Sequence, residues 1–131
     1  MKNILHCLWI LACGVGLSGC ATVKTARNFE GLRVDGGAKP VATVAIENYG
    51  YYLFGLIPLI AGEPRYPNVP RCTLFNDTVT AQNNMLMLSK TAQKTGAKKV
   101  SHVRVYEHWT GSFSFWVVWQ KQLFTGAVLT E

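Results

Sequence analysis

The clearest periodic pattern of hydrophobic and polar positions lies between Asn76 and Gly96. At about 100° per residue, one stripe of this segment is hydrophobic and the opposite stripe is polar and basic. The hydrophobic stripe holds Ala81, Met85, Leu88 and Ala92, with Leu86 beside it. Residues 76–95 are therefore predicted to form an amphipathic helix. Asn76 or Asp77 would cap its start, and Gly96 would end it in the left-handed conformation.

Strand patterns follow this helix. Residues 99–107 alternate between apolar and polar positions, 113–119 are apolar on both faces, and 123–129 return to a strand pattern. Thr110-Gly111 and Lys121-Gln122 are predicted to be the turns between them. Consecutive strands with short connections favour an antiparallel meander.

The segments before the helix are less regular. Residues 41–46 are β-branched and apolar, which predicts a buried strand. Residues 47–62 are strongly apolar, but glycine and proline interrupt them, so either an irregular strand pair or a turn with a short helix fits. Three prolines in residues 63–70 predict an extended loop. Together these elements predict one α+β domain over residues 41–131, a small mainly antiparallel sheet with one helix packed on one face.

A different pattern occupies the N-terminus. After Lys2, an apolar run extends over residues 4–17 and ends in Leu17-Ser18-Gly19-Cys20. The run is too short to span a bilayer, which needs about 20 apolar residues. Its length is that of the hydrophobic region of a secretory signal peptide.

Leu17-Ser18-Gly19-Cys20 resembles the lipobox of bacterial lipoproteins. The resemblance implies that residues 1–19 are a signal peptide, that Cys20 carries a diacylglycerol, and that fatty acids such as palmitate anchor the protein to a membrane. Ala21 after the cysteine favours, by analogy with enteric bacteria, the outer membrane on its periplasmic side. The alternatives are a secretory signal cleaved near Ala21 and an uncleaved N-terminal anchor. Residues 77–129 are also similar to small α+β domains of envelope lipoproteins, where a helix ending in Gly-Ala leads into antiparallel strands.

Charge and composition add a tether and a class of partner. Residues 20–40 are rich in glycine with little periodicity, so we expect a lipidated tether there. Removing residues 1–19 leaves 12 Lys and Arg against 7 Asp and Glu, a net charge near +5. A basic envelope protein suits anionic partners such as lipid head groups. Export and the scattered positions of the charges argue against nucleic acid.

Candidate chemistry is sparse. The potential metal ligands or nucleophiles of the mature chain are Cys72, His102 and His108, and they form no known ligand motif. His102 and His108 would lie about 20 Å apart along a straight strand. Cys72 is expected to be buried, His102 to lie on a sheet face and His108 in a turn. We therefore expect neither a catalytic site, nor a metal, nor a cofactor.

Aromatic residues are the remaining signal. They crowd residues 109–119 and 49–52, where they either fill the core or form an exposed patch for a partner. Trp116 and Val118 are the candidate residues for a partner surface, which an envelope protein, a second copy or the membrane would contact. The first functional hypothesis is thus a non-enzymatic binding or structural lipoprotein. The alternative is a small envelope enzyme or metal-handling protein that uses Cys72, His102 or His108.

Overall fold

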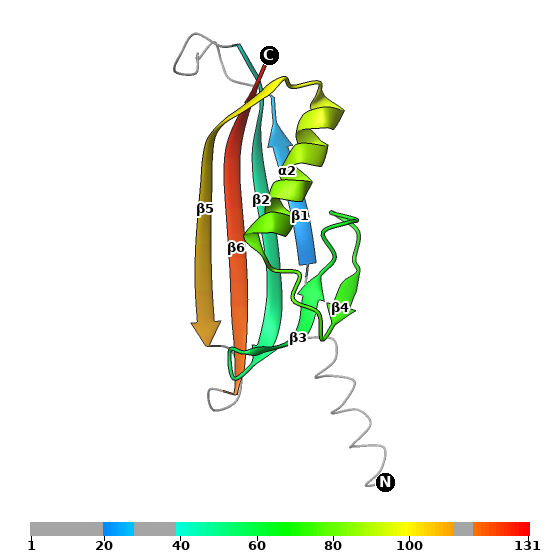
Figure 1. The fold of residues 1–131 in the computed structure, drawn as a ribbon, viewed down its shortest axis with the longest axis vertical. Coiled ribbons are helices and arrows are strands. Elements are labelled where there is room, and N and C mark those ends of the chain that lie inside the picture. Colours follow the sequence, from blue (N-terminus) through cyan, green and yellow to red (C-terminus); the bar gives the residue numbers. More distant parts are fainter. Residues whose placement is uncertain (1–19, 28–38, 112–116) are drawn as a thin grey trace, which may run out of the picture.

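The computed structural model describes residues 20–27, 39–111 and 117–131, and within them the predicted α+β fold is confirmed. One six-stranded antiparallel sheet carries one helix on one face (Figure 1). The strand order is β4-β3-β2-β6-β5, and β1 also pairs with β2. The elements are β1 (Cys20–Ala26), β2 (Pro40–Leu53), β3 (Ile57–Gly62), β4 (Cys72–Leu74), α2 (Ala81–Thr95), β5 (Lys99–Gly111) and β6 (Val118–Thr130).

Strand β2 organises the sheet. Its alternate residues from Ala42 to Tyr52 are buried, so one face of this 14-residue strand supplies much of the core. Strand β6 pairs along one edge of β2, while β1 and β3 share the other edge. The start of β1 therefore abuts the end of β3. A Cβ atom on Gly62 would lie only 2.4 Å from the carbonyl carbon of Cys20.

Helix α2 covers the upper part of the sheet (Figure 1) and begins later than predicted. Thr80 is the N-cap, and its hydroxyl accepts a hydrogen bond from the Asn83 backbone N–H. Asp77 instead accepts hydrogen bonds from the Val79 N–H at 3.0 Å and the Tyr52 hydroxyl at 2.6 Å. The end of the helix is confirmed, because Gly96 adopts φ 72°.

The buried stripe of α2 differs from the predicted one. Its buried residues are Asn84, Met87, Leu88 and Ala92, while Ala81, Met85 and Leu86 are exposed. Met87, Leu88 and Ala92 pack with Ala21, Ala42, Val44, Ile46, Ala127 and Leu129. The helix still buries a stripe of period 3.6, but one position of that stripe is an asparagine.

Several strand predictions need correction. The turn predicted at Lys121-Gln122 is wrong, because β6 continues through both residues. Thr110 and Gly111 belong to β5, and most of the predicted strand 113–119 lies outside the described residues. The meander is only partly right, since β6 lies between β5 and β2.

Two predictions for the N-terminal half have different outcomes. Residues 47–62 form the strand pair that was one alternative, with a register shift between Tyr51 and Tyr52. The first part of the expected tether, Cys20–Ala26, is instead the seven-residue strand β1. In the described part of the chain, the sheet therefore begins at Cys20.

Candidate functional site

Cys20 is the first residue of β1 and pairs with Tyr49 of β2. The next residue, Ala21, is buried in the core beneath α2. Because successive side chains of a strand point to opposite faces, the Cys20 side chain lies on the sheet face opposite the helix, which we call the far face. The residue is half-buried, and its thiol forms no disulfide.

From Cys20 to the end of the sheet, the far face is apolar over β2, β3 and β4, whereas β6 adds Gln120 beside Tyr51 and Gln122 beside Tyr49. Directly paired residues share a face, so Tyr51, Ile60 and Leu74 form one row across β2, β3 and β4. Leu53 forms a second row with Ile57 and Val118. Tyr49 lies just above these rows, and its ring contacts that of Tyr51 edge-to-face at 6.4 Å.

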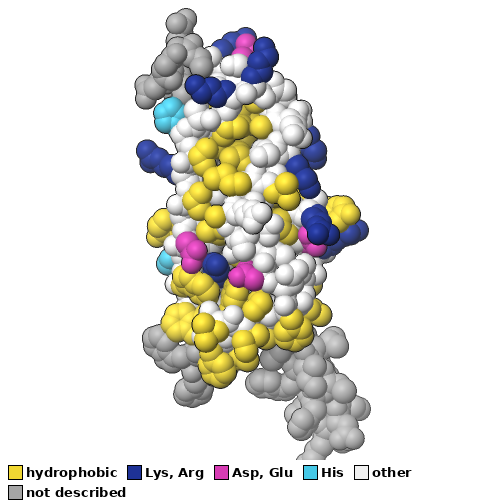
Figure 2. Space-filling model, in the orientation of Figure 1, with side chains coloured by type: hydrophobic (Ala, Val, Ile, Leu, Met, Phe, Trp, Pro, Cys, Tyr) yellow, Lys and Arg dark blue, Asp and Glu magenta, His cyan; other side chains and the backbone are white. Residues whose placement is uncertain are grey.

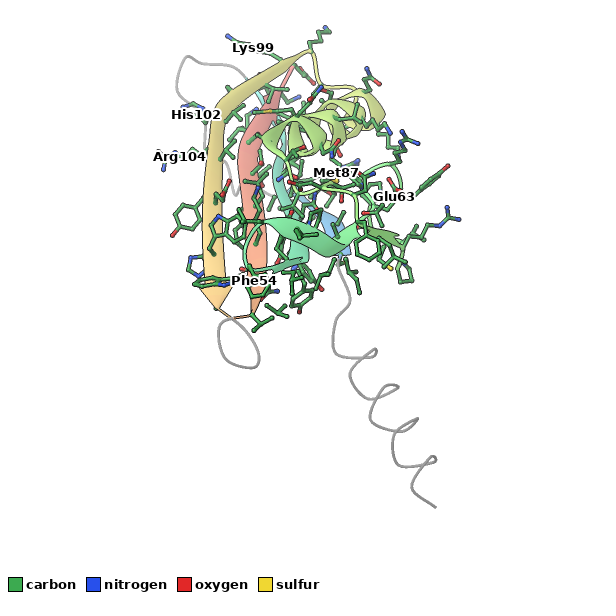
Figure 3. All side chains as sticks on the ribbon, turned by 60° about the horizontal axis from the view of Figure 1, so that its bottom comes forward. Phe54, Glu63, Met87, Lys99, His102 and Arg104 are labelled. Carbon is green, nitrogen blue, oxygen red and sulfur yellow. The ribbon has the colours of Figure 1, made fainter. Side chains whose placement is uncertain are left out.

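The same end of the molecule carries exposed hydrophobic side chains in the β2–β3 turn and after β4. The exposed fractions are 62% for Phe54, 81% for Leu56, 50% for Ile57, 65% for Leu74 and 72% for Phe75. Figure 2 shows hydrophobic side chains gathered at this end, and Figure 3 places Phe54 there. We call this surface the apolar end, and it comprises Tyr51, Leu53, Phe54, Leu56, Ile57, Ile60, Leu74, Phe75 and Val118.

Charged residues border the apolar end near Cys20. On the far face, Glu47 lies two residues from Tyr49. The loop between β3 and β4 carries Arg65 and Arg71, both exposed. Asn68 fastens this loop to β1, because its Oδ1 accepts from the Val23 N–H at 2.8 Å and its own backbone N–H donates to the Ala21 carbonyl at 2.9 Å.

A second cluster, of charged and aromatic residues, lies on the helix-bearing face below α2. Lys121 Nζ lies 5.9 Å from the Tyr52 ring centroid, 5.4 Å from the Trp109 ring centroid and 3.9 Å from a Glu107 carboxylate oxygen. Trp109 Nε1 donates to the other Glu107 oxygen at 2.6 Å. Burial, followed by the hydrogen bond to Asp77, raises the pKa of Tyr52 far above its usual value. The phenol therefore stays a protonated donor, and its hydrogen bond holds Asp77 to β2.

The predicted chemical residues do not meet. Cys72 is exposed on β4, so the expectation of burial is wrong, and His102 and His108 are exposed on β5. Three strands separate β4 from β5, which corresponds to about 19 Å at the usual strand spacing. His108 lies in a strand rather than a turn, and its ring stacks against Tyr106 at 6.4 Å. Within residues 20–27, 39–111 and 117–131, no group of three or more His, Cys, Asp and Glu side chains is placed to hold a metal.

Of the two residues predicted for a partner surface, the structure places one. Val118 begins β6, is half-buried and pairs with Leu53 in the apolar end, whereas Trp116 lies outside the described residues. Sequence reasoning missed Phe54, Leu56, Leu74 and Phe75. The strongly apolar composition of 47–62 was the available signal for the first two, but it did not distinguish exposed from buried positions.

In the part of the chain that the structure covers, no helix combines the length and apolar character needed to cross a membrane. Comparisons of the chain with protein-family models, with curated proteins and with solved structures find no match.

Proposed function

We propose that the protein is a bacterial envelope lipoprotein, anchored through a diacylglycerol on Cys20, with a non-enzymatic binding or structural role. The observation that carries this proposal is Leu17-Ser18-Gly19-Cys20 directly after a basic start and a short apolar run. The position of Cys20 agrees with it. Cys20 is the first residue of the sheet among the described residues, so cleavage before Cys20 would remove no part of the described domain.

The apolar end supports a binding role. Five large hydrophobic side chains with exposed fractions of 50–81% gather at one end of a small domain. Such a contiguous patch is typical of an interaction surface rather than of a bare monomer surface. The separation of Cys72 from both histidines gives the enzyme or metal-handling alternative no geometric support.

Metabolic labelling tests the anchor. Cells that express the full chain are grown with radiolabelled palmitate, and the mature N-terminal peptide is analysed by mass spectrometry. We expect label on the protein, a lipid-modified Cys20 as the first residue, and complete loss of label in Cys20→Ala. Cys72→Ser is the matched control, and it should keep the label. An unmodified Cys20 in the mature protein would overturn the proposal.

The localisation of the protein and its role require separate measurements. We expect the protein to sediment with outer-membrane fractions on a density gradient. Crosslinking in intact envelopes should give the same partners for the wild type and for a variant with Cys72→Ser, His102→Gln and His108→Gln combined. A changed crosslinking pattern in that variant would favour the enzyme or metal-handling alternative.

A further inference from the structure

We propose that the apolar end rests on the bilayer that holds the anchor, so that the sheet lies obliquely on the membrane with its far face toward the lipid. This inference rests on the proposed anchoring through Cys20. It adds a second, non-covalent contact made by the folded domain itself, and it names the lipid surface as the partner of the apolar end.

The positions along β2 define the geometry. Cys20 pairs with Tyr49, and Phe54 follows five residues later at the turn, a distance of about 17 Å along an extended strand. Interfacial protein segments bury their apolar side chains about 5–10 Å into the boundary between head groups and acyl chains. If Cys20 lies at head-group level, these depths require the strands to incline about 55–70° from the bilayer normal. Leu74 lies on the far face, so a sheet inclined with that face toward the lipid brings Leu74 to the surface together with the turn.

Backbone conformation indicates that two of these side chains are displayed for a purpose other than folding. Phe54 and Phe75 both adopt φ 53°, a conformation that bulky residues rarely take and that glycine takes readily. Hydrogen bonds from the Phe54 N–H to the Val117 carbonyl and from the Phe75 N–H to the Leu59 carbonyl hold these backbones in place. Both rings are mostly exposed, so core packing does not account for phenylalanine at either position.

Charge complementarity selects a lipid surface as the occupant. Arg65 and Arg71 outnumber the single carboxylate, Glu63, in the loop that Asn68 fastens to β1 near Cys20. Basic side chains at this level would meet anionic head groups, while Tyr49 and Tyr51 lie between them and the apolar turn, as aromatic rings do at membrane interfaces. Glu47 lies on the far face beyond Tyr49, in register with Phe124 of β6.

The anchor favours the bilayer over a second copy of the chain. A lipid on Cys20 holds the apolar end within a few tens of ångströms of the membrane, which makes contact with lipid effectively intramolecular. A second copy must be met at the ordinary concentration of the protein. The nearest large apolar phase is therefore the membrane itself.

Fluorescence quenching by spin-labelled lipid tests the contact. The full chain is expressed with Cys72→Ser and Leu56→Cys, and the lipidated product is labelled with an environment-sensitive fluorophore. It is then reconstituted into vesicles of phosphatidylethanolamine and phosphatidylglycerol, with and without doxyl-labelled phospholipid. Leu56 is 81% exposed, so this substitution should leave the fold intact. Ser89→Cys, at an exposed position on α2 and thus on the other face, is the matched control.

We expect doxyl lipid to reduce the emission at position 56 by about half or more and to leave position 89 nearly unchanged, because only position 56 reaches the acyl boundary. If mass spectrometry finds Cys20 lipidated while position 56 is quenched no more than position 89, the docking proposal is overturned and the anchor stands. A blue shift at position 56 that grows with protein concentration, without quenching by doxyl lipid, would identify a second copy as the occupant and also overturn it. An unmodified Cys20 would remove the anchor and this inference with it.

Discussion

At the scale of single residues, buried polar side chains decide how the helix sits on the sheet. Asn84 is fully buried, and its Nδ2 donates to the Leu123 carbonyl at 3.1 Å and to Thr125 Oγ1 at 3.0 Å. Asn48, equally buried, donates to the Thr78 carbonyl at 2.7 Å. The two hydrogen bonds of the Asn84 amide thus fix the position of α2 on β6. An apolar side chain at this point would pack against β6 without fixing that position.

Replacing Asn84 tests this role. Asn84→Ala removes both hydrogen bonds and leaves a small cavity, so we expect the free energy of unfolding to fall by about 1–3 kcal/mol. Gln82→Ala, at an exposed position on the same helix, should change it by less than about 0.5 kcal/mol. Urea unfolding followed by tryptophan fluorescence measures both values. Equal effects of the two substitutions would contradict the role assigned to Asn84.

Tyr52 gives the domain a dependence on alkaline pH. In the unfolded chain its phenol ionises near pH 10, whereas burial and Asp77 keep it protonated in the folded state. The folded state therefore binds more protons above pH 10. The contribution of Tyr52 is complete below that pH and is lost as pH rises, at up to about 1.4 kcal/mol per pH unit.

Tyr52→Phe should remove this part of the slope, and it should lower stability by about 1 kcal/mol near neutral pH through the lost hydrogen bond. Tyr106→Phe, at an exposed position on β5, is the control. Unfolding free energies from urea titrations between about pH 8 and 11 give the slopes. If the unfolding free energy of Tyr52→Phe falls with pH as steeply as that of the wild type, Tyr52 is not the source of the alkaline pH dependence.

At the scale of elements, the contact between β1 and β3 depends on one glycine. A Cβ atom on Gly62 would meet the backbone of Cys20 and Ala21 at 2.4–2.6 Å, and backbone atoms cannot move aside cheaply. A Cβ atom added to Gly126, in the middle of β6, would meet no other atom within 4 Å. The two glycines therefore form a matched pair.

We expect Gly62→Ala to destabilise the domain by about 1–3 kcal/mol, because β1 must move away from β3. Gly126→Ala should be neutral or stabilising by up to about 1 kcal/mol, since it removes only backbone freedom from a strand. The urea concentrations at the unfolding midpoints of the two variants, measured at neutral pH, test these expectations. Similar midpoints for both variants would show that β1 and β3 do not need this close approach.

The elements also explain where sequence reasoning succeeded and failed. The end of α2 was predictable because Gly96 acts locally, through its own left-handed conformation. The false turn at Lys121-Gln122 has a tertiary cause. Lys121 is a polar residue in a strand because Trp109, Tyr52 and Glu107 surround it and leave only 14% of its side chain exposed. The local sequence at residues 121–122 does not indicate these tertiary contacts.

At the scale of the whole molecule, the candidate site also has one part that depends on local sequence and another that depends on tertiary contacts. The assignment of Cys20 as the lipid-attachment residue could be made from the sequence alone, because the motif behind it is four consecutive residues, and it stays a prediction. The apolar end was not, because Leu56, Leu74 and Val118 come together only through the pairing of β2 with β3 and β6, and of β3 with β4. The prediction of a tether also concealed how close Cys20 lies to the apolar end. A flexible segment after Cys20 would have separated the proposed anchor from the domain.

The direct junction between Cys20 and β1 predicts that the distance between anchor and domain matters. Inserting ten glycine and serine residues between Cys20 and Ala21 adds a flexible connection of about 17 Å on average and breaks only the first residue pair of β1. Palmitate incorporation should persist, because Leu17-Ser18-Gly19-Cys20 is unchanged. Quenching at position 56 by doxyl lipid should fall to about half of its original value or less, since the longer connection lowers the effective concentration of the apolar end at the bilayer. Full quenching in the inserted variant would mean that the apolar end binds lipid strongly by itself, and that the direct junction of Cys20 with the sheet serves another purpose.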